Sequence, residues 1–106
     1  MSGSRTTTGD EGRLDNVHPG DILRHDFLIG SDIPVAEVSA GAGIDVARLN
    51  ALLNRRIGID AEMDLRLARY FGLSEGVLLG LQNDYDIEEA KRAANGALDR
   101  IIPRAA

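Results

Sequence analysis

The polar side chains between Arg48 and Arg56 have the chemistry of nucleic-acid contacts. An asparagine such as Asn50 can form paired hydrogen bonds with adenine, and an arginine such as Arg48 can bind guanine or a phosphate oxygen. Arg55 and Arg56 follow where a nucleic-acid backbone would pass. The alternatives are ordinary surface roles, in which the asparagine bonds backbone or water and each arginine is solvated or pairs with an acid. The choice depends on the elements that position these residues.

Residues 33–56 predict two short helices joined by a tight turn. Pro34 begins the first helix, in which Val38 points inward. Gly43 takes a positive φ freely and is expected to form the turn, with Ile44 following it as an apolar plug. Two short helices in this arrangement form a helix-turn-helix motif, which places its second helix in the major groove of DNA.

The second helix of the motif is expected to open at Asp45, whose carboxylate can serve as N-cap, and to run to about Asn54. Helical spacing turns Val46, Leu49 and Leu53 inward. The residues left for contact with DNA are Asp45, Ala47, Arg48, Asn50, Ala51, Arg55 and Arg56. The two alanines either pack against thymine methyl groups or only keep the helix surface low enough to approach the bases.

A helix is expected before the motif and two after it. The first begins at Pro19, where a proline forfeits no needed donor, and ends near Ile29, before a break at residues 30–32. Asp21 places negative charge beside the positive end of its dipole. The inward residues of this first helix are Ile22, Leu23, Phe27 and Leu28.

The helix after the motif is expected over residues 61–71, with Asp60 as N-cap and Gly72 at the C-terminal cap. Its expected inward residues are Ala61, Leu65, Ala68 and Phe71. Arg66 and Arg69 alternate with these and are expected to be solvated or salt-bridged. The sequence therefore predicts a strongly amphipathic helix directly after the motif.

A last helix is expected to begin at a Ser74 cap and to end at Gly96. Its apolar stripe consists of Val77, Leu78, Leu81 and Tyr85, with Gln82 at the edge. After Ile87 the side chains become polar and are expected to project into solvent. With this helix the expected fold is all-α with five helices.

The length of 106 residues, with 43% hydrophobic residues, predicts one small domain with a modest core. We expect a flexible N-terminal tail over residues 1–17, the helical domain with a C-terminal dimerisation helix over 18–95, and an extension over 96–106. In the extension, residues 98–102 either add a short strand or contact a partner. The apolar runs are far shorter than the roughly 20 residues of a membrane span, and no signal core follows the N-terminus, so a cytoplasmic protein without a membrane partner is expected.

The formal net charge of −5 argues against a protein that coats nucleic acid through bulk charge. It is compatible with a protein that recognises DNA through one small local surface. The absence of cysteine excludes disulfides, thiolate zinc sites and a cysteine nucleophile. His18 and His25 are poorly spaced for a metal and are expected at a helix start and on the surface. The acidic residues of the last helix, Asp84, Asp86, Glu88 and Glu89, lack the pattern of a calcium loop and suit a solvated face or a basic partner. We expect no cofactor, metal or enzymatic activity.

Several segments in a fixed order carry a family resemblance: HPGDILRHDFL at 18–28, GI..ARLNALLN within 43–54, LRLARYFGLS at 65–74 and LQNDYDIE at 81–88. On these segments the chain resembles the lambda-repressor-like (Xre-type) DNA-binding domains and, more narrowly, the HigA-type antitoxins of bacterial toxin–antitoxin pairs. The resemblance implies a homodimeric repressor that binds a palindrome in its own promoter and sequesters a small, basic, ribosome-dependent mRNA-cleaving toxin. In such a dimer the recognition helices enter successive major grooves, roughly 34 Å apart.

The last helix is the candidate for the two-fold contact, through Val77, Leu78, Leu81, Gln82 and Tyr85. The sequence also departs from the usual pattern of the family. Val35 replaces a glutamine that bonds a phosphate, Ala51 replaces a longer polar side chain, Asp45 replaces a serine or threonine, and Val77-Leu78 replaces a Phe-Trp pair. Two alternatives therefore remain open: a stand-alone regulator of the same fold, and a toxin-binding module with weakened DNA binding.

Overall fold

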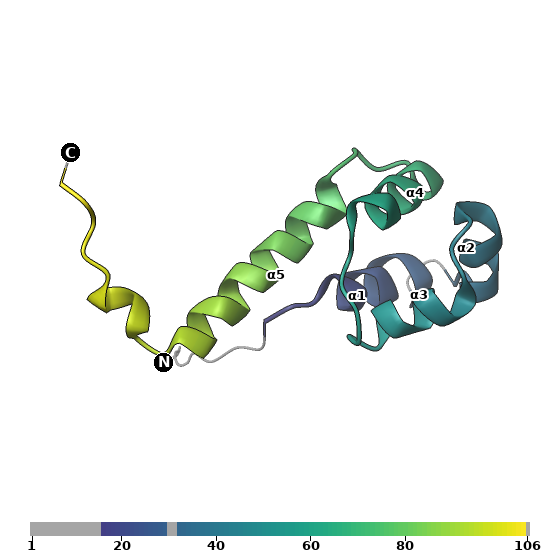
Figure 1. The fold of residues 1–106 in the computed structure, drawn as a ribbon. Coiled ribbons are helices and arrows are strands. Elements are labelled where there is room, and N and C mark those ends of the chain that lie inside the picture. The colour runs from purple at the N-terminus through teal and green to yellow at the C-terminus, as the bar shows by residue number, and fades with distance from the viewer. Residues whose placement is uncertain (1–15, 30–31, 106) are drawn as a thin grey trace, which may run out of the picture.

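The computed structural model describes residues 16–29 and 32–105, and this part of the chain contains helices and no strand. The elements are α1 (Pro19–Ile22), η1 (Leu23–Ile29), α2 (Val35–Ala42), α3 (Val46–Leu53), α4 (Ala61–Phe71), α5 (Val77–Ala94) and η2 (Ala97–Arg100). The first helix continues from α1 into η1, which has the wider π-helical winding. The helices α1 to α4 gather into one body, and α5 runs away from it (Figure 1). The all-α prediction is confirmed. Residues 1–15 of the tail expected at 1–17, and residues 30–31 of the break expected at 30–32, lie outside the described residues. Asn16, near the end of the expected tail, is held against α5, because its side chain donates to the Tyr85 carbonyl at 2.8 Å.

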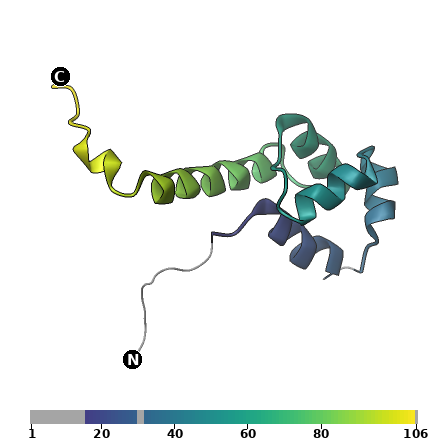
Figure 2. The same ribbon diagram turned by 60° about the horizontal axis from the view of Figure 1, so that its bottom comes forward.

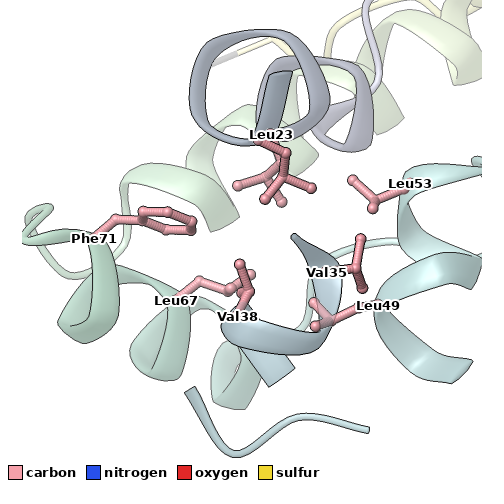
Figure 3. A pocket seen from close by; sticks show the side chains of 8 residues that line it. Leu23, Val35, Val38, Leu49, Leu53, Leu67 and Phe71 are labelled. Carbon is pink, nitrogen blue, oxygen red and sulfur yellow. The ribbon is translucent and has the colours of Figure 1, made fainter. Parts of the chain in front are cut away.

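The core lies between the motif helices, α4 and the start of α5. Its buried apolar side chains include Leu23, Val38, Ile44, Leu49, Leu52, Met63, Leu67 and Leu78. A gap of about 10 Å³ remains among apolar side chains from the first four helices, several of which are labelled in Figure 3. A gap of this size and composition is part of the core and has no room for a ligand.

The turn of the motif has the expected geometry. Gly43 has a φ of 72°, and its amide donates to the Ser39 carbonyl at 2.9 Å, which ends α2. Ile44 and Val38 are both buried, as predicted. Gly41 is needed for close packing, because a Cβ there would come within 2.1 Å of the Tyr70 ring on α4. The α2–α4 contact therefore depends on a residue without a side chain.

The inward faces of α3 and α4 differ in part from the prediction. Val46 is 43% exposed and Leu52 is fully buried, because the buried stripe of α3 starts only at Leu49, after its first turn. In α4, Leu65 is 48% exposed and Ala61 is also exposed. The buried residues of α4 are Met63, Asp64, Leu67 and Ala68. The prediction for α4 is therefore right for Ala68 and for the half-buried Phe71, wrong for Ala61 and Leu65, and did not include Met63, Asp64 and Leu67.

Asp64 is buried because its carboxylate caps another helix. Its oxygens accept from the backbone amides of Gly76 at 2.6 Å and of Leu78 and Leu79 at 2.9 Å. These amides belong to the N-terminus of α5, where the dipole also favours a negative charge. The predicted Ser74 cap is therefore wrong: Gly76 occupies the N-cap position, and the side chain that satisfies the amides comes from α4.

His18 joins the start of α1 to α5. Its Nδ1 accepts from the Gly20 amide at 2.9 Å, and its own amide donates to Asp21 at 3.2 Å, which forms a capping box. Its ring lies edge-on to Tyr85, with 4.8 Å between ring centroids. The predicted role at a helix start is confirmed, but His18 is buried and not on the surface. Burial lowers the pKa of His18 below its ordinary value of 6.5.

The helix α5 uses part of its predicted interface within the protomer. Leu78 and Gln82 are buried, and the Gln82 amide oxygen accepts from the Ile59 amide at 2.8 Å. Val77 is 45% exposed, and Leu81 and Tyr85 are half-buried. The two-fold contact between protomers stays a prediction. The exposed side chains of α5 would have to form it.

The segment after α5 forms a short 3-10 helix, η2, in place of the strand that was one alternative. Leu98, Ile101 and Ile102 are all exposed in this part of the chain. Within the described ranges, no helix is long and apolar enough to cross a membrane.

Candidate nucleic-acid interface

The outward side of α3 is a narrow face of small and amide side chains. A helix turns about 100° per residue, so Ala47 and Asn54, seven residues apart, point in nearly the same direction. Asn50 and Ala51 lie on either side of that direction, and Leu49 with its buried neighbours faces the core. We call Ala47, Asn50, Ala51 and Asn54 the groove face. Its low relief would let α3 approach base edges closely.

Asn54 is the member of this face that sequence reasoning missed, because it was treated only as the end of the helix. Its Nδ2 donates to the Asn50 carbonyl at 2.9 Å. Its Oδ1 accepts from Arg24 at 3.3 Å, and the same guanidinium donates to the Leu53 carbonyl at 2.8 Å. Arg24 of η1 thus holds the C-terminal end of α3. The seven-residue spacing from Ala47 was the signal in the sequence that could have found Asn54.

Asn50 differs from Asn54 in the state of its side chain. The side chain is exposed, and the described part of the chain offers its amide no hydrogen-bond partner. Its backbone carbonyl accepts from both the backbone amide and the side chain of Asn54. Asn50 is therefore the polar side chain of α3 that is free to read a base.

Arg48 lies at the border between α3 and α4 and is paired with an acid. Its Nη2 is 2.5 Å from Oδ2 of Asp60, and the two side chains are 38% and 56% exposed. The other oxygen of Asp60 accepts from the Met63 amide at 2.8 Å, which confirms Asp60 as the N-cap of α4. Arg48 is thus held beside the groove face by the first turn of the next helix.

Arg55 is paired at the other end of α3. It has a φ of 63°, and its guanidinium lies 2.5 Å from Asp21, to which both Nε and Nη2 donate. The hydrogen bond with Arg55 lowers the pKa of Asp21 below its ordinary value of 3.8. Because Asp21 also closes the capping box at His18, this pair ties the connection after α3 to the start of α1.

The two remaining predicted contacts, Asp45 and Arg56, are both exposed. Asp45 stands at the N-cap position of α3, but its side chain makes no capping bond, so that part of the prediction is wrong. Arg56 follows the helix, and no ion pair or side-chain hydrogen bond engages its guanidinium among the described residues. Arg56 is therefore available to a phosphate in a way that Arg48 and Arg55 are not.

An open groove borders this surface where the first helix meets α2. It is lined by Arg24, Leu28, Ile29, Val35, Asn50, Leu53 and Asn54. Val35, the first residue of α2, is half-buried and packs against the core, and its side chain offers no hydrogen-bond donor to this groove. The polar rim of this groove consists of Arg24 and the two asparagines.

The arginines of α4 are salt-bridged or solvated, as predicted. Arg66 pairs with Glu62 at 3.2 Å and donates to the Ala42 carbonyl at 3.3 Å, which closes the end of α2. Arg69 is exposed on the same helix. Among residues 16–29 and 32–105, no group of three His, Cys, Asp or Glu side chains is arranged to hold a metal ion. The polar chemistry of this surface is therefore that of hydrogen bonding and ion pairing.

A helix-turn-helix with a buried turn plug and an exposed amide-bearing second helix defines a DNA-binding domain of the lambda-repressor-like class. The chain matches no protein-family model. It is 31% identical over 87 residues to "Virulence-associated protein I" of Dichelobacter nodosus, covering 82% of this chain and 80% of that protein.

Solved structures are similar along nearly the whole described chain. An antitoxin HigA of Pseudomonas aeruginosa, solved with the higBA promoter, is 32% identical with a TM-score of 0.79, covering 86% of this chain and all of that one. A HigA-family addiction module antidote protein of Coxiella burnetii is 28% identical with a TM-score of 0.79, at the same coverage of 86% and 100%. This chain belongs to the HigA family of antitoxins.

Proposed function

We propose that this protein is the antitoxin of a type II toxin–antitoxin pair and that it represses its own operon as a DNA-binding homodimer in the cytoplasm. The observation that carries the proposal is the similarity to a HigA solved with its promoter, over a chain whose α3 exposes an unpaired Asn50. The protein would act by binding, without catalysis. Its α3 would occupy promoter DNA, while another surface would cover a small, basic, ribosome-dependent mRNA-cleaving toxin.

The DNA contacts that we propose are the groove face together with the arginines at its borders. Asn50 would bind a base edge, and Ala47 and Ala51 would lie close to the floor of the groove. Arg56 would bind a phosphate directly, whereas Arg48 and Arg55 would first have to leave their acidic partners. Asp45 would lie near the backbone and would oppose a phosphate by its charge.

A gel-shift titration on the DNA upstream of the gene tests the repressor role. Specific binding should appear with the full-length protein and weaken steeply as salt is raised, because phosphate contacts release counterions. Random-sequence DNA of equal length is the control. Equal affinity for the two duplexes would refute operator recognition.

Co-expression with the product of the neighbouring reading frame tests the antitoxin role. A small basic protein should co-purify with this chain, and its inhibition of growth should be relieved. If no such frame lies beside the gene and nothing co-purifies, the protein is a stand-alone regulator.

A toxin-binding module with weakened DNA binding is the second candidate. The observation that favours it is that Arg48 and Arg55, two of the predicted DNA contacts, are both in ion pairs with aspartates. Co-purification of the toxin without any gel shift in low salt would support this candidate over the first.

A further inference from the structure

Two aspartates flank the recognition helix α3 in the same way. Asp21 closes the capping box of α1, and Asp60 is the N-cap of α4. Each also pairs with an arginine that the sequence assigned to DNA: Asp21 with Arg55 and Asp60 with Arg48. The same carboxylates that begin neighbouring helices therefore neutralise positive charge at both sides of α3.

The Asp60 pair is the one that DNA could break. Both of its side chains are substantially exposed, and a single Nη2–Oδ2 contact at 2.5 Å joins them. Exposed pairs of this kind contribute little to stability. Asp21, by contrast, receives two donors from Arg55, is 27% exposed, and is also tied to the His18 amide. Arg48 is therefore the arginine that can exchange its acidic partner for a phosphate without disturbing the start of a helix.

An arginine that exchanges a carboxylate for a phosphate gains less than a free arginine. The ion pair with Asp60 must be lost, and the Asp60 carboxylate remains close to the DNA backbone, where it repels phosphates. The loss applies to every duplex, because phosphate contacts carry no sequence information. A loss of equal free energy on every duplex lowers affinity in general and leaves the ratio of operator to non-operator affinity unchanged.

We propose that Asp60 limits the affinity of this protein for DNA of any sequence by holding Arg48 away from phosphates. The inference rests on the proposed function, because it requires that α3 faces DNA. In this role Asp60 is a positioning residue that acts through Arg48.

Asp60→Asn is the direct test, because asparagine retains the oxygen that caps Met63 and removes the charge that holds Arg48. Affinity for a random-sequence duplex in low salt should rise by about three- to tenfold, and the slope of log K against log salt should steepen by about two, one for each Arg48 of the dimer. Affinity for the upstream operator should rise by a similar factor, so the preference for the operator should stay the same.

Glu62→Gln is the matched control, because it changes the net charge equally and releases Arg66, which lies on α4 and contacts the end of α2. It should leave the salt slope unchanged. In the Arg48→Ala background, Asp60→Asn should lose most of its effect. Thermal unfolding of each variant checks that the fold persists.

Two results would overturn the inference while leaving the proposed function intact. One is an Asp60→Asn variant that binds both duplexes with the same affinities and the same salt slope as the unchanged protein. The other is an equal effect in Glu62→Gln, which would assign the change to net charge. If the unchanged protein shows no preference for the operator, the proposed function itself fails, and that result is distinct from both.

Discussion

At the scale of single residues, the side chains around α3 differ in whether they already have a hydrogen-bond or ion-pair partner within the protein. Arg48 and Arg55 hold aspartates, and Asn54 holds the backbone of its own helix and Arg24. Asn50 is left with a free amide in the described structure. A residue whose hydrogen-bonding groups are unused gains the most from a base edge, because nothing within the protein has to be broken first.

Asn50→Ala should therefore lower operator affinity by about 1–3 kcal/mol, the value of a paired hydrogen bond to a base. Affinity for random-sequence DNA should change much less, because the phosphate contacts remain. Competitive gel shifts with both duplexes measure the difference. Arg69→Ala, on the exposed side of α4, is the control and should leave the preference for the operator as it is. A parallel loss on both duplexes would remove Asn50 from base recognition.

The sequence identified the residue types of this site but not their partners. Arg55 and Asp21 are 34 residues apart in the chain, and Arg48 and Asp60 are 12 apart, so neither pair has the spacing of neighbours on one helix. Pairing with an acid was the stated alternative to a DNA contact for each arginine. Only the packing of α1 and α4 around α3 shows which acid each arginine pairs with. Val46 was misplaced for a similar reason, since the first turn of α3 extends beyond the core.

His18 provides a prediction about pH. Its lowered pKa means that the unfolded chain takes up a proton below about pH 6.5, before the folded chain does. The contribution of His18 to stability is therefore complete above pH 6.5 and declines as the pH falls toward the pKa of the folded state. The contribution of Asp21 is lost only when the pH falls below 3.8, the ordinary pKa of its carboxyl group, so the two pH ranges do not overlap.

Urea unfolding followed by circular dichroism should show a lower free energy of unfolding at about pH 5.5 than at about pH 7.5. The difference should be smaller in His18→Gln, which cannot be protonated in this range. His25→Gln, at an exposed position, should keep the full difference. An undiminished difference in His18→Gln would assign the pH dependence to other groups.

At the scale of elements, the sequence predicted each helix but not the contact that docks α5. The bounds of α2, α3 and α4 agree with their caps and breaks, because Gly43, Asp60 and Gly72 act locally. The cap of α5 is not local. It is supplied by Asp64, and a buried carboxylate within an amphipathic pattern reads as an outward residue until the amides that satisfy it are seen.

Asp64→Ala should lower the free energy of unfolding by about 2 kcal/mol, because it leaves amides at the start of α5 without their acceptor. Asp64→Asn should cost less, since one acceptor oxygen remains. Glu75→Ala, an exposed acid in the same connection, is the control and should have little effect. These values are measured by urea unfolding at neutral pH. An Asp64→Ala protein as stable as the unchanged one would show that α5 is held by its apolar contacts alone.

At the scale of the whole molecule, α5 extends beyond the body that holds the motif, as Figure 2 shows most clearly. It contacts α4 and α1 and then η2, and its buried residues, Leu78 and Gln82, lie in its first half. A helix with so little packing along its length is only marginally stable in water. Val77 and Ile87, 45% and 53% exposed, are apolar residues for which a second copy would provide cover.

Substitutions on α5 test whether these exposed residues carry the proposed homodimer. Val77→Asp should yield monomers by light scattering, because it would place an unpaired carboxylate in the contact. Leu81→Asp should do the same, but Leu81 also packs against the core, so Val77 is the cleaner position. Asp84→Asn, a polar exchange at an exposed site on the same helix, is the control.

The consequence for DNA binding follows from geometry. Two recognition helices reach successive major grooves only if the dimer holds them about 34 Å apart, so a monomer keeps one half-site contact and loses the other. Val77→Asp should therefore lose most of its operator affinity while its circular dichroism stays helical, and the salt slope should fall toward half, because half of the phosphate contacts are lost. A variant that remains dimeric and binds the operator normally would place the two-fold contact elsewhere on the chain.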